Sequence, residues 1–403
     1  MKRHEILGQL NGLQGMMIEL VQSIPEDDCY RFFHSDIPPL AWLLGRAVYI
    51  ETYWLREVLQ EDNDLTKRVK HLFSNEVIVD ESLVKQLPPQ EHLLNWALEI
   101  QENNLILLAN PDQLPKHPLL DNEHIPLRIL QEYALRYEQV ISQLNQKAIM
   151  EKLNPYQVVK ELKPASPATE FVEMHGGHYR IGAKKNPLAM DNELPAQVVE
   201  LSSYRIHKNP VSNAEWLAFM KAEGYSNKAF WSDAGWQWLE QNEITHPAFW
   251  KQDIMRRWFT VGLNGSSDLI ADDAVCGISQ YEAKAYANWV SEQASEDEKA
   301  LVGAVVQHEY QWESCTRTNN IQRNQQVREW CSNEFHPYTG YIQPQNKEAQ
   351  SDFSGEKQII RGTSMHSSRV LERASYRYAA DASQRSMFTG TRLVFPPSDM
   401  PWH

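Results

Sequence analysis

The chain has 403 residues, of which 42% are hydrophobic, and it carries a formal net charge of −14 at pH 7. A chain of this length predicts two domains, and the apolar fraction is high enough for each domain to bury a core. The acidic balance argues against a general nucleic-acid binder and against a protein held on anionic membranes, so neither kind of partner is expected.

Sorting signals and cysteine usage both favour a cytoplasmic protein. The chain has no run of about 18 apolar residues that could span a bilayer, and residues 1–12 lack the long apolar segment of a secretory signal. The four cysteines are scattered and form no CxxC pair, as is typical of reduced thiols: Cys29, Cys276, Cys315 and Cys331.

Helical periodicity dominates the first 150 residues. Apolar residues recur every three or four positions in four segments, which predicts helices over residues 5–24, 40–60, 91–109 and 127–148. Pro38 and Pro39 directly precede the second segment, where prolines suit a helix start. Four amphipathic helices with one long connection, over residues 60–90, indicate a helix bundle.

The composition and the periodicity of the sequence change after residue 150. Residues 151–169 contain three prolines and lose periodicity, which indicates an interdomain linker. Short strand-like segments with Gly and Asn-Pro turns follow, together with two helices predicted over residues 213–222 and 279–292. The organisation is therefore a bundle over residues 1–150, a linker over 151–169 and a mixed α and β domain over 170–403.

Two histidine patterns suggest metal chemistry, and each has a structural alternative. His175 and His178 flank two glycines, so they are either two ligands of a metal or the ends of a hairpin turn, and no third ligand is nearby in the sequence. His308-Glu309 is not the start of an HExxH zinc motif, because position 312 is Trp. A helix that buries Trp312 is the better interpretation.

Cysteines and arginines supply three further candidates. Cys315 and Cys331 are either nucleophiles or buried structural thiols, and the absence of a paired His motif favours the second interpretation. In residues 376–392, several arginines among aromatic residues either bind a carboxylate or pair internally with acidic residues: Arg377, Arg385 and Arg392. Glu132 and Arg136, four residues apart on a helix, are by pattern alone an ordinary ion pair worth a few tenths of a kcal/mol.

The second half of the chain resembles the formylglycine-generating-enzyme, or sulfatase-modifying factor, domain. The resemblance rests on a long collinear series of segments: Gly176-Gly177, Ile181-Gly182, Asp191–Glu193, Pro210–Asn213, Glu215-Trp216, Gly235–Trp238, Pro247–Trp250, Val275–Trp289, Trp312-Glu313, Val327–Trp330, Pro337–Gly340, Arg361–Ser364 and Gly390–Arg392. The first half resembles the DinB-like bundle of ergothioneine sulfoxide synthases, notably over Phe33–Trp42. The fold class implied is α+β: a DinB-like four-helix bundle followed by a formylglycine-generating-enzyme-like (C-type-lectin-like) domain.

The synthases that this chain resembles join a thiol to a trimethylated histidine, using oxygen and one iron(II) on three bundle histidines. The resemblance places those ligands at Arg46, Glu132 and Arg136, and only the trailing acid of the family's H-E-x-x-H-x-E motif persists, as Glu138. A guanidinium carries permanent charge and has no lone pair to donate, so two of the three positions cannot ligate a cation. No metal cofactor is therefore expected, and the three side chains are expected to converge at the domain interface with a surplus of positive charge.

The substrate-binding and catalytic positions implied by the resemblance also differ from the family pattern. The family's F-R-N-W-D segment is Tyr376–Ala380 here, without the Asn and Asp that hold the thiol substrate. The segment of the family's catalytic tyrosine holds Tyr338 and Tyr341, the two catalytic candidates. The two cysteines of copper-dependent formylglycine generators correspond to Ser367 and Glu372. The candidate ligand-binding residues are Arg46, Glu132, Arg136, Glu138, Trp330, Arg377 and Arg385.

Three functional hypotheses follow, and they leave open whether the chain is an enzyme. In the first, a metal-free relative of the synthases binds a small amino-acid-like or anionic ligand in the interdomain cleft. In the second, an oxygen-dependent enzyme that forms a C–S bond holds iron(II) through other residues, with His34, His124 and Glu138 as candidates. In the third, both pockets are closed and the chain is a structural or interaction protein, for which a protein partner is the expected ligand.

Overall fold

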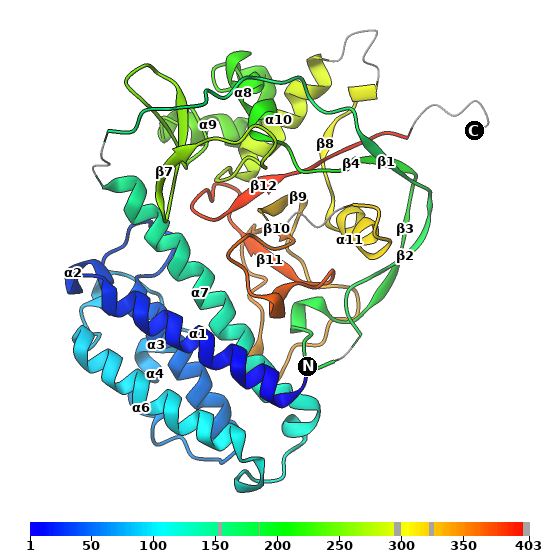
Figure 1. The fold of residues 1–403 in the computed structure, drawn as a ribbon. Helices are drawn as coiled ribbons and strands as arrows, with labels where there is room; N and C mark the ends of the chain where they lie inside the picture. The colour runs from blue at the N-terminus through cyan, green and yellow to red at the C-terminus, as the bar shows by residue number, and fades with distance from the viewer. Residues whose placement is uncertain (152–154, 185, 294–299, 322–325, 398–403) are drawn as a thin grey trace.

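The computed structural model describes residues 1–151, 155–184, 186–293, 300–321 and 326–397. Helices of the first 150 residues form one side of the molecule, and short strands with four helices form the other (Figure 1). Helix α7 (His124–Met150) runs between the two sides and belongs to the bundle. A helical N-terminal region followed by a sheet-containing domain confirms the predicted α+β fold class.

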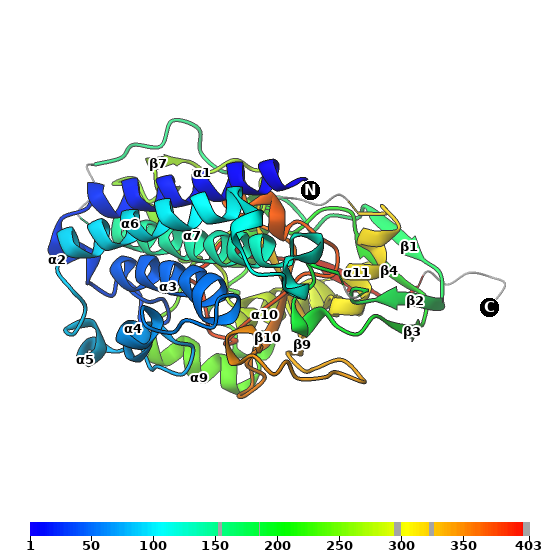
Figure 2. The same ribbon diagram turned by 90° about the horizontal axis from the view of Figure 1, so that it is seen from below.

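The bundle contains the four predicted long helices, which lie side by side in the view from below (Figure 2): α1 (Arg3–Ser23), α3 (Leu40–Thr52), α6 (Gln90–Ala109) and α7. α3 continues into a π-helical turn, η1 (Tyr53–Val58). The segment expected to be a plain connection contains two short helices, α4 (Thr66–Phe73) and α5 (Glu81–Val84), and α2 (Glu26–Cys29) follows α1. Two 3₁₀ helices, η2 (Pro111–Gln113) and η3 (Pro118–Glu123), precede α7.

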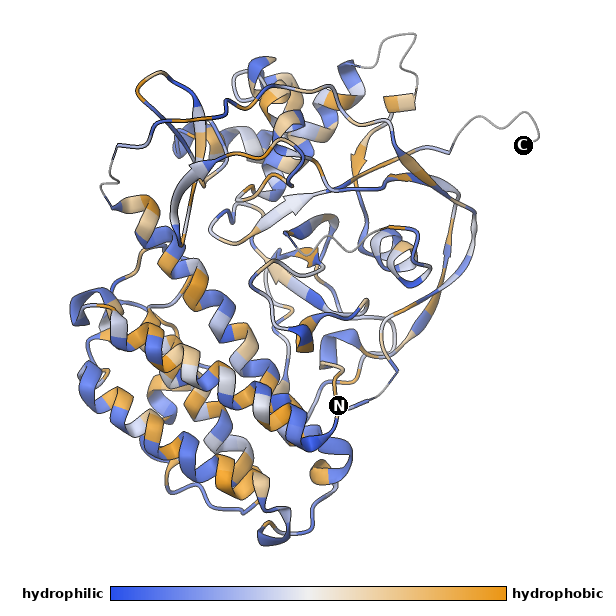
Figure 3. Ribbon diagram, in the orientation of Figure 1, coloured by the Kyte–Doolittle hydropathy of each residue, from blue (hydrophilic) through white to orange (hydrophobic). Residues whose placement is uncertain are grey.

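Helix α3 is the centre of the bundle, since every one of its residues is buried. Its sequence is apolar on nearly all faces, as expected for a helix enclosed by neighbours, whereas the other long helices carry apolar and polar residues on different faces (Figure 3). Close packing at its centre requires a glycine: a Cβ at Gly45 would lie 2.3 Å from the ring of Phe73 in α4. That ring stacks on Trp96, with the centroids 6.0 Å apart, so it has little room to move.

The second region holds two four-stranded sheets. One has the order β1-β4-β13-β8 and is antiparallel: β1 (Phe171–Met174), β4 (Tyr204–His207), β13 (Leu393–Phe395) and β8 (Val305–Val306). The other has the order β11-β10-β9-β12, with β12 parallel to β9: β11 (Arg377–Ala380), β10 (Gln358–Arg361), β9 (Arg328–Glu334) and β12 (Thr389–Thr391). The second sheet faces α7 and supplies part of the interdomain site.

Smaller sheets and four helices complete this region. The strand pair is β2 (Gly177–Ile181) with β3 (Gln197–Leu201), and the three-stranded sheet is β5 (Trp250–Gln252), β6 (Trp258–Gly262) and β7 (Gly265–Asp268). The helices are α8 (Asn213–Lys221), α9 (Asp233–Gln241), α10 (Gln280–Gln293) and α11 (Glu309–Arg317). Capping boxes at Ser212 and Ser279 begin α8 and α10, as the sequence predicts.

The His-Gly-Gly-His segment does not form the expected hairpin. β1 pairs with β4 and β2 pairs with β3, so the two glycines bend the chain from one sheet into another. The prediction for His308-Glu309 is confirmed, because α11 begins there and buries Trp312. Cys315 and Cys331 are buried free thiols, and burial raises the pKa of Cys315 to about 11.

Apolar side chains join the two halves into one structure. Val370 and Leu371, from the 3₁₀ turn η8 (Arg369–Leu371), belong to the bundle's own core cluster. Ile141 of α7 packs with Phe249 and Phe388 of the second region. Among the described residues, no helix is both long and apolar enough to cross a membrane.

The Gly45 contact gives a stability prediction. Gly45→Ala should lower the free energy of unfolding by about 1–3 kcal/mol, because the displaced Phe73 ring outweighs the better helix propensity of Ala. Gly8→Ala in α1 is the matched control, since a Cβ there meets nothing within 4 Å, and it should raise stability by about 0.5–1 kcal/mol. Urea unfolding of both variants measures this, and a neutral Gly45→Ala would contradict the packing described.

A buried carboxyl in the bundle gives a second prediction. Burial raises the pKa of Glu51 to about 8 from its ordinary 4.5, although Tyr133 and Gln14 donate hydrogen bonds of 2.7 and 3.0 Å to it. Because the folded state holds this proton more tightly, the stability it contributes is present at low pH and is lost as pH rises towards 8.

The uncharged isostere isolates this effect. Between about pH 5 and pH 8 the parent should lose up to about 1.4 kcal/mol per pH unit relative to Glu51→Gln. Denaturant unfolding of both proteins across that range measures the difference. A constant difference in stability would show that the Glu51 carboxyl is ionised throughout.

Candidate functional site

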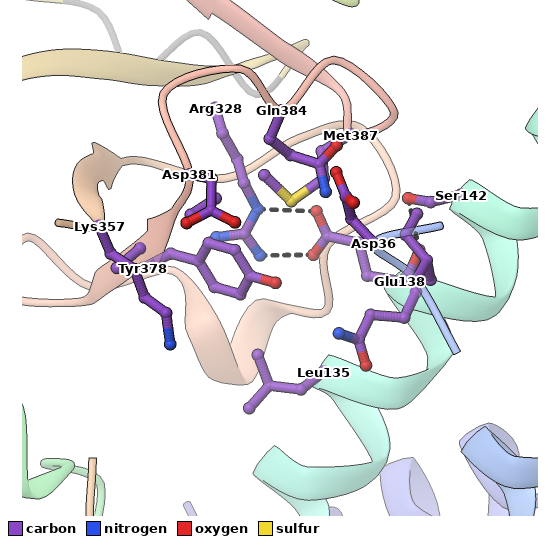
Figure 4. A pocket seen from close by; sticks show the side chains of 14 residues that line it. Asp36, Leu135, Glu138, Ser142, Arg328, Lys357, Tyr378, Asp381, Gln384 and Met387 are labelled. Atoms are coloured by element: carbon purple, nitrogen blue, oxygen red, sulfur yellow. Dashed lines mark hydrogen bonds and ion pairs between the residues drawn. The ribbon is translucent and has the colours of Figure 1, made fainter. Parts of the chain in front are cut away.

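A buried ion pair joins α7 to the second sheet. Arg328, the first residue of β9, donates to both carboxylate oxygens of Glu138, at 2.7 and 2.5 Å (Figure 4). The hydroxyls of Ser364 and Ser367 donate to the same carboxylate, at 2.9 and 2.8 Å. Burial alone would raise the pKa of Glu138, but Arg328 and the two serines hold it below its ordinary value. The carboxylate is therefore ionised and fully engaged.

A cavity of about 170 Å³ opens beside this pair, and we call it the polar cavity. Its charged lining comes from separate elements (Figure 4): Asp36 precedes α3, Lys357 precedes β10 and Asp381 follows β11. Tyr378 and Ala380 also line it, and these are the positions where the resemblance places the Asn and Asp of the thiol-substrate site. The guanidinium of Arg328 lies 4.9 Å from the centre of the Tyr378 ring, which shields one side of the ion pair.

Nearer the start of α7, the structure brings Glu132 and Arg136 together with Arg46 of α3. Glu132 lies between the two arginines, with Oε1 at 2.7 Å from the Arg136 Nε and 3.5 Å from the Arg46 Nε. Burial would raise the pKa of Glu132, but Arg136 and Arg46 hold it below the ordinary value. The side chains of Arg46, Glu132 and Arg136 are 5%, 15% and 19% exposed, so all three lie mostly out of solvent.

A fourth charged group, Glu348, changes the charge balance expected from the sequence. Its carboxylate lies 2.8 Å from Arg46 and accepts a longer bond from the Tyr49 hydroxyl, at 3.3 Å. Two arginines now face two glutamates, so the surplus positive charge expected of the trio is cancelled. Glu348 belongs to a single 3₁₀ turn, η7 (Lys347–Ala349), about 200 residues from α7, and no sequence signal indicated it.

A second cavity, of about 200 Å³, is lined by this cluster, and we call it the arginine cavity. It also includes two charged residues that sequence reasoning missed, Arg128 and Asp191. Asp191 is fully engaged, because it accepts from the Tyr341 hydroxyl at 2.7 Å and from the backbone and side chain of Ser351, at 2.7 and 2.5 Å. Arg128 differs: its one hydrogen bond to a described residue goes to the Ala349 carbonyl, at 3.2 Å.

No carboxylate among the described residues comes within ion-pair distance of Arg128. Burial lowers the pKa of this guanidinium, and the charges of Asp191 and Glu132 oppose that effect only from a distance. Arg128 lies one helical turn before Glu132, on the same face of α7. This four-residue spacing from Glu132 was the feature of the sequence that could have indicated Arg128 as a site residue.

A third and larger cavity, of about 530 Å³, borders the arginine cavity, and we call it the apolar cavity. The two cavities share four lining residues, Trp54, Arg128, Asp191 and Ala349. The rest of its wall is mostly small or apolar: Leu119, Ala183, Ala189, Leu194, Pro195, Ala196, Gly340, Ile342 and Pro344. Arg128 therefore stands at the junction of a charged space and an apolar one.

The structure places the other candidate residues outside these cavities, in internal contacts. Arg377 donates to Glu309 at 2.9 Å and lies 4.1 Å from the centre of the Tyr338 ring. Arg385 pairs with Glu282 at 3.0 Å. Trp330 is fully buried and donates to a backbone carbonyl at 2.8 Å. Arg377 and Arg385 thus take the internal pairing that the sequence offered as the alternative to carboxylate binding.

The residues considered as alternative iron ligands do not gather at one point. His34 lies 3.7 Å from Asp36 and burial lowers its pKa, His124 lines the apolar cavity, and Glu138 is paired with Arg328. Within the part of the chain that the structure describes, no three His, Cys, Asp or Glu side chains form a metal-ligand group.

Comparison with known proteins agrees with the fold. The sulfatase-modifying factor enzyme 1-like domain family matches residues 156–326. Hercynine oxygenase of Mycobacterium tuberculosis is 27% identical over 53% of this chain, and that of Mycolicibacterium thermoresistibile is 28% identical over 52%. The chain spans 58% and 54% of the length of these two relatives.

A solved structure, PvdO from Pseudomonas aeruginosa, is similar over 60% of this chain and 99% of its own, at 15% identity and a TM-score of 0.38. The family match includes those segments of the sequence resemblance that lie between Gly176 and Glu313. Residues 156–326 of the chain thus match the sulfatase-modifying factor enzyme 1-like domain family, and the chain is similar to hercynine oxygenases over about half of its length.

Proposed function

We propose that this chain binds a small amino-acid-like carboxylate in the interdomain cleft, at the arginine cavity, without an iron centre. The observation that carries the proposal is Arg128, a guanidinium that lines the cavity with no carboxylate at ion-pair distance among the described residues. Arg128 is half-buried, so its guanidinium is partly removed from water without gaining an opposite charge. A ligand carboxylate supplies the missing partner and accepts two parallel hydrogen bonds from the guanidinium fork.

An amino group also finds a partner in this cavity. Glu348 accepts only the 3.3 Å bond from Tyr49 in addition to its ion pair with Arg46. A carboxylate has about four acceptor positions, so Glu348 retains capacity for an ammonium donor. Its side chain is 5% exposed, so such a donor is out of bulk water. A zwitterion with one acidic and one basic end matches this arrangement, whereas a simple anion uses only Arg128.

The residues at the positions implied for iron do not fit a metal ion. Arg46 and Arg136 present permanent cations with no lone pair, and the carboxylate of Glu132 is already held between them. A divalent cation placed there meets two positive charges at close range. Iron-dependent oxygen chemistry is therefore not part of this proposal. Instead, Arg46, Glu132 and Arg136 form part of the wall of the ligand site.

A second candidate is the oxygenase activity for which the relatives are named. Similarity of 27–28% to hercynine oxygenases supports it. The internal pairing of Glu138 with Arg328 weighs against it, because that carboxylate has no free oxygen to offer a metal. The two candidates differ in whether the protein binds iron(II), and this can be measured directly.

Amino-acid binding is the test of the first candidate. We expect at least one common L-amino acid to raise the melting temperature and to give a saturable isotherm in titration calorimetry. Arg128→Gln should weaken that binding about 10- to 100-fold, the value of a charge-assisted hydrogen bond. Arg180→Gln, which changes an exposed arginine on β2, is the control and should leave binding unchanged. If both variants bind the amino acid equally well, Arg128 does not contact the ligand.

Metal binding is the test of the iron-free proposal. Anaerobic titration of the parent protein with iron(II), or with cobalt(II) as a coloured substitute, should give no stoichiometric complex. The triple variant Arg46→His, Glu132→His, Arg136→His should bind cobalt(II) with a visible absorption band, because it supplies three neutral imidazoles at one point. A stoichiometric iron complex of the parent protein would instead favour the oxygenase candidate.

A further inference from the structure

We infer that the ligand of the arginine cavity carries a bulky apolar side chain, and that this side chain occupies the neighbouring apolar cavity. The inference rests on the proposed function, and it names the class of ligand: an amino acid with a large aromatic or aliphatic side chain. Its starting point is that Arg128 lines both cavities. A carboxylate bound there leaves the α-carbon substituent next to the apolar space.

The size and lining of the apolar cavity set the kind of group that fits. Its volume is about 530 Å³, within the range of small-molecule sites in proteins. The space exists because several wall positions are small, among them Ala183, Ala189, Ala196 and Gly340, while Trp54 and Leu119 provide broad apolar contact. A wall with so few polar groups holds water poorly, so a hydrocarbon group gains by entering it.

The charges around the apolar cavity agree with one acidic group on the ligand. Its Lys, Arg, Asp and Glu lining, among the described residues, is Arg128, Lys184 and Asp191, whose formal charges sum to +1. Asp191 gives its oxygens to Tyr341 and Ser351, so it offers little to a second cation. The carboxylate of an α-amino acid balances this charge, while its ammonium group lies in the arginine cavity beside Glu348. A dicarboxylate overshoots this balance, and a bare amine adds to the positive charge.

The position of Arg128 also fixes how the two parts of the ligand are connected. Trp54, Asp191 and Ala349 join Arg128 in forming the boundary that the two cavities share. The acidic group and the apolar group of the ligand must therefore lie close together, on either side of these shared residues. An α-amino acid meets this condition because its side chain branches from the carbon beside the carboxylate. Small amino acids such as glycine leave the apolar cavity unused.

The test compares side chains on one backbone. L-Alanine, L-leucine, L-phenylalanine, L-tryptophan, L-glutamine and L-glutamate are titrated into the full-length protein by calorimetry. Affinity should rise from alanine to leucine to the aromatic residues, by about fourfold for each methylene buried. Glutamine should bind no better than alanine, and glutamate worse. Phenethylamine, which has the apolar group but no carboxylate, should not bind.

A variant that fills the apolar cavity tests whether the side chain of the ligand binds there. Ala196→Phe should weaken the binding of phenylalanine and tryptophan at least tenfold and leave alanine unchanged, because the new ring takes their space. Ala196→Ser is the size-matched control and should preserve the ranking. Far-UV circular dichroism and the melting temperature establish that both variants fold, and the series on the parent protein does not depend on either variant.

Each contrary result has a distinct meaning. If amino acids bind through Arg128 without regard to apolar size, or with polar ones preferred, this inference is wrong and the proposed function stands. If the apolar preference survives Ala196→Phe, the side chain lies elsewhere and the inference is again wrong. If no amino acid binds the parent protein, the proposed function and this inference fail together.

Discussion

The ion pair between Glu138 and Arg328 fixes how the two halves of this protein meet. Four hydrogen bonds reach the Glu138 carboxylate, two from the guanidinium and one each from the hydroxyls of Ser364 and Ser367. A buried pair of this kind adds little net stability, yet removal of one partner typically costs about 3–5 kcal/mol because the other charge is left uncompensated. Its effect is therefore on geometry: α7 is held against the first residue of β9 in one register. Every cavity described above has a wall on that helix, so the shape of each depends on this contact.

Helix α7 distributes its residues among the three cavities by helical spacing. Glu138 and Leu135 line the polar cavity, Glu132 and Arg136 line the arginine cavity, and Arg128 lines the arginine and apolar cavities. Residues four apart share a face, so Arg128, Glu132 and Arg136 succeed one another along a single line on the helix. The same helix buries its opposite side against α1 and α3 in the bundle core. A side chain on this line is thus supported from behind by the core while its charged end faces the second domain.

The sequence was most informative where one period persists, and least informative where distant segments meet. The long helices were predictable because their apolar stripes run for several turns, whereas α4 and α5 are too short to show a period. Arg46, Glu132 and Arg136 could be expected together because a family resemblance related their positions. Glu348 could not, since it approaches from a single turn and has no pattern of its own. Arg128 was within reach, one turn before Glu132, but an isolated arginine on a helix gives no indication that its partner is missing.

The contrast between Arg128 and its neighbours explains why the proposed site selects a carboxylate. Arg46 and Arg136 share Glu132, and Arg46 also has Glu348, so these charges cancel at distances of 2.7 to 3.5 Å. Asp191 lines the same cavity as Arg128, but hydrogen bonds from Tyr341 and Ser351 hold its oxygens in place. Because these hydrogen bonds are strong in a low-dielectric interface, the Asp191 carboxylate does not leave them to pair with Arg128. The guanidinium donors of Arg128 therefore remain available to an incoming acid, and the apolar space beside them decides what that acid can carry.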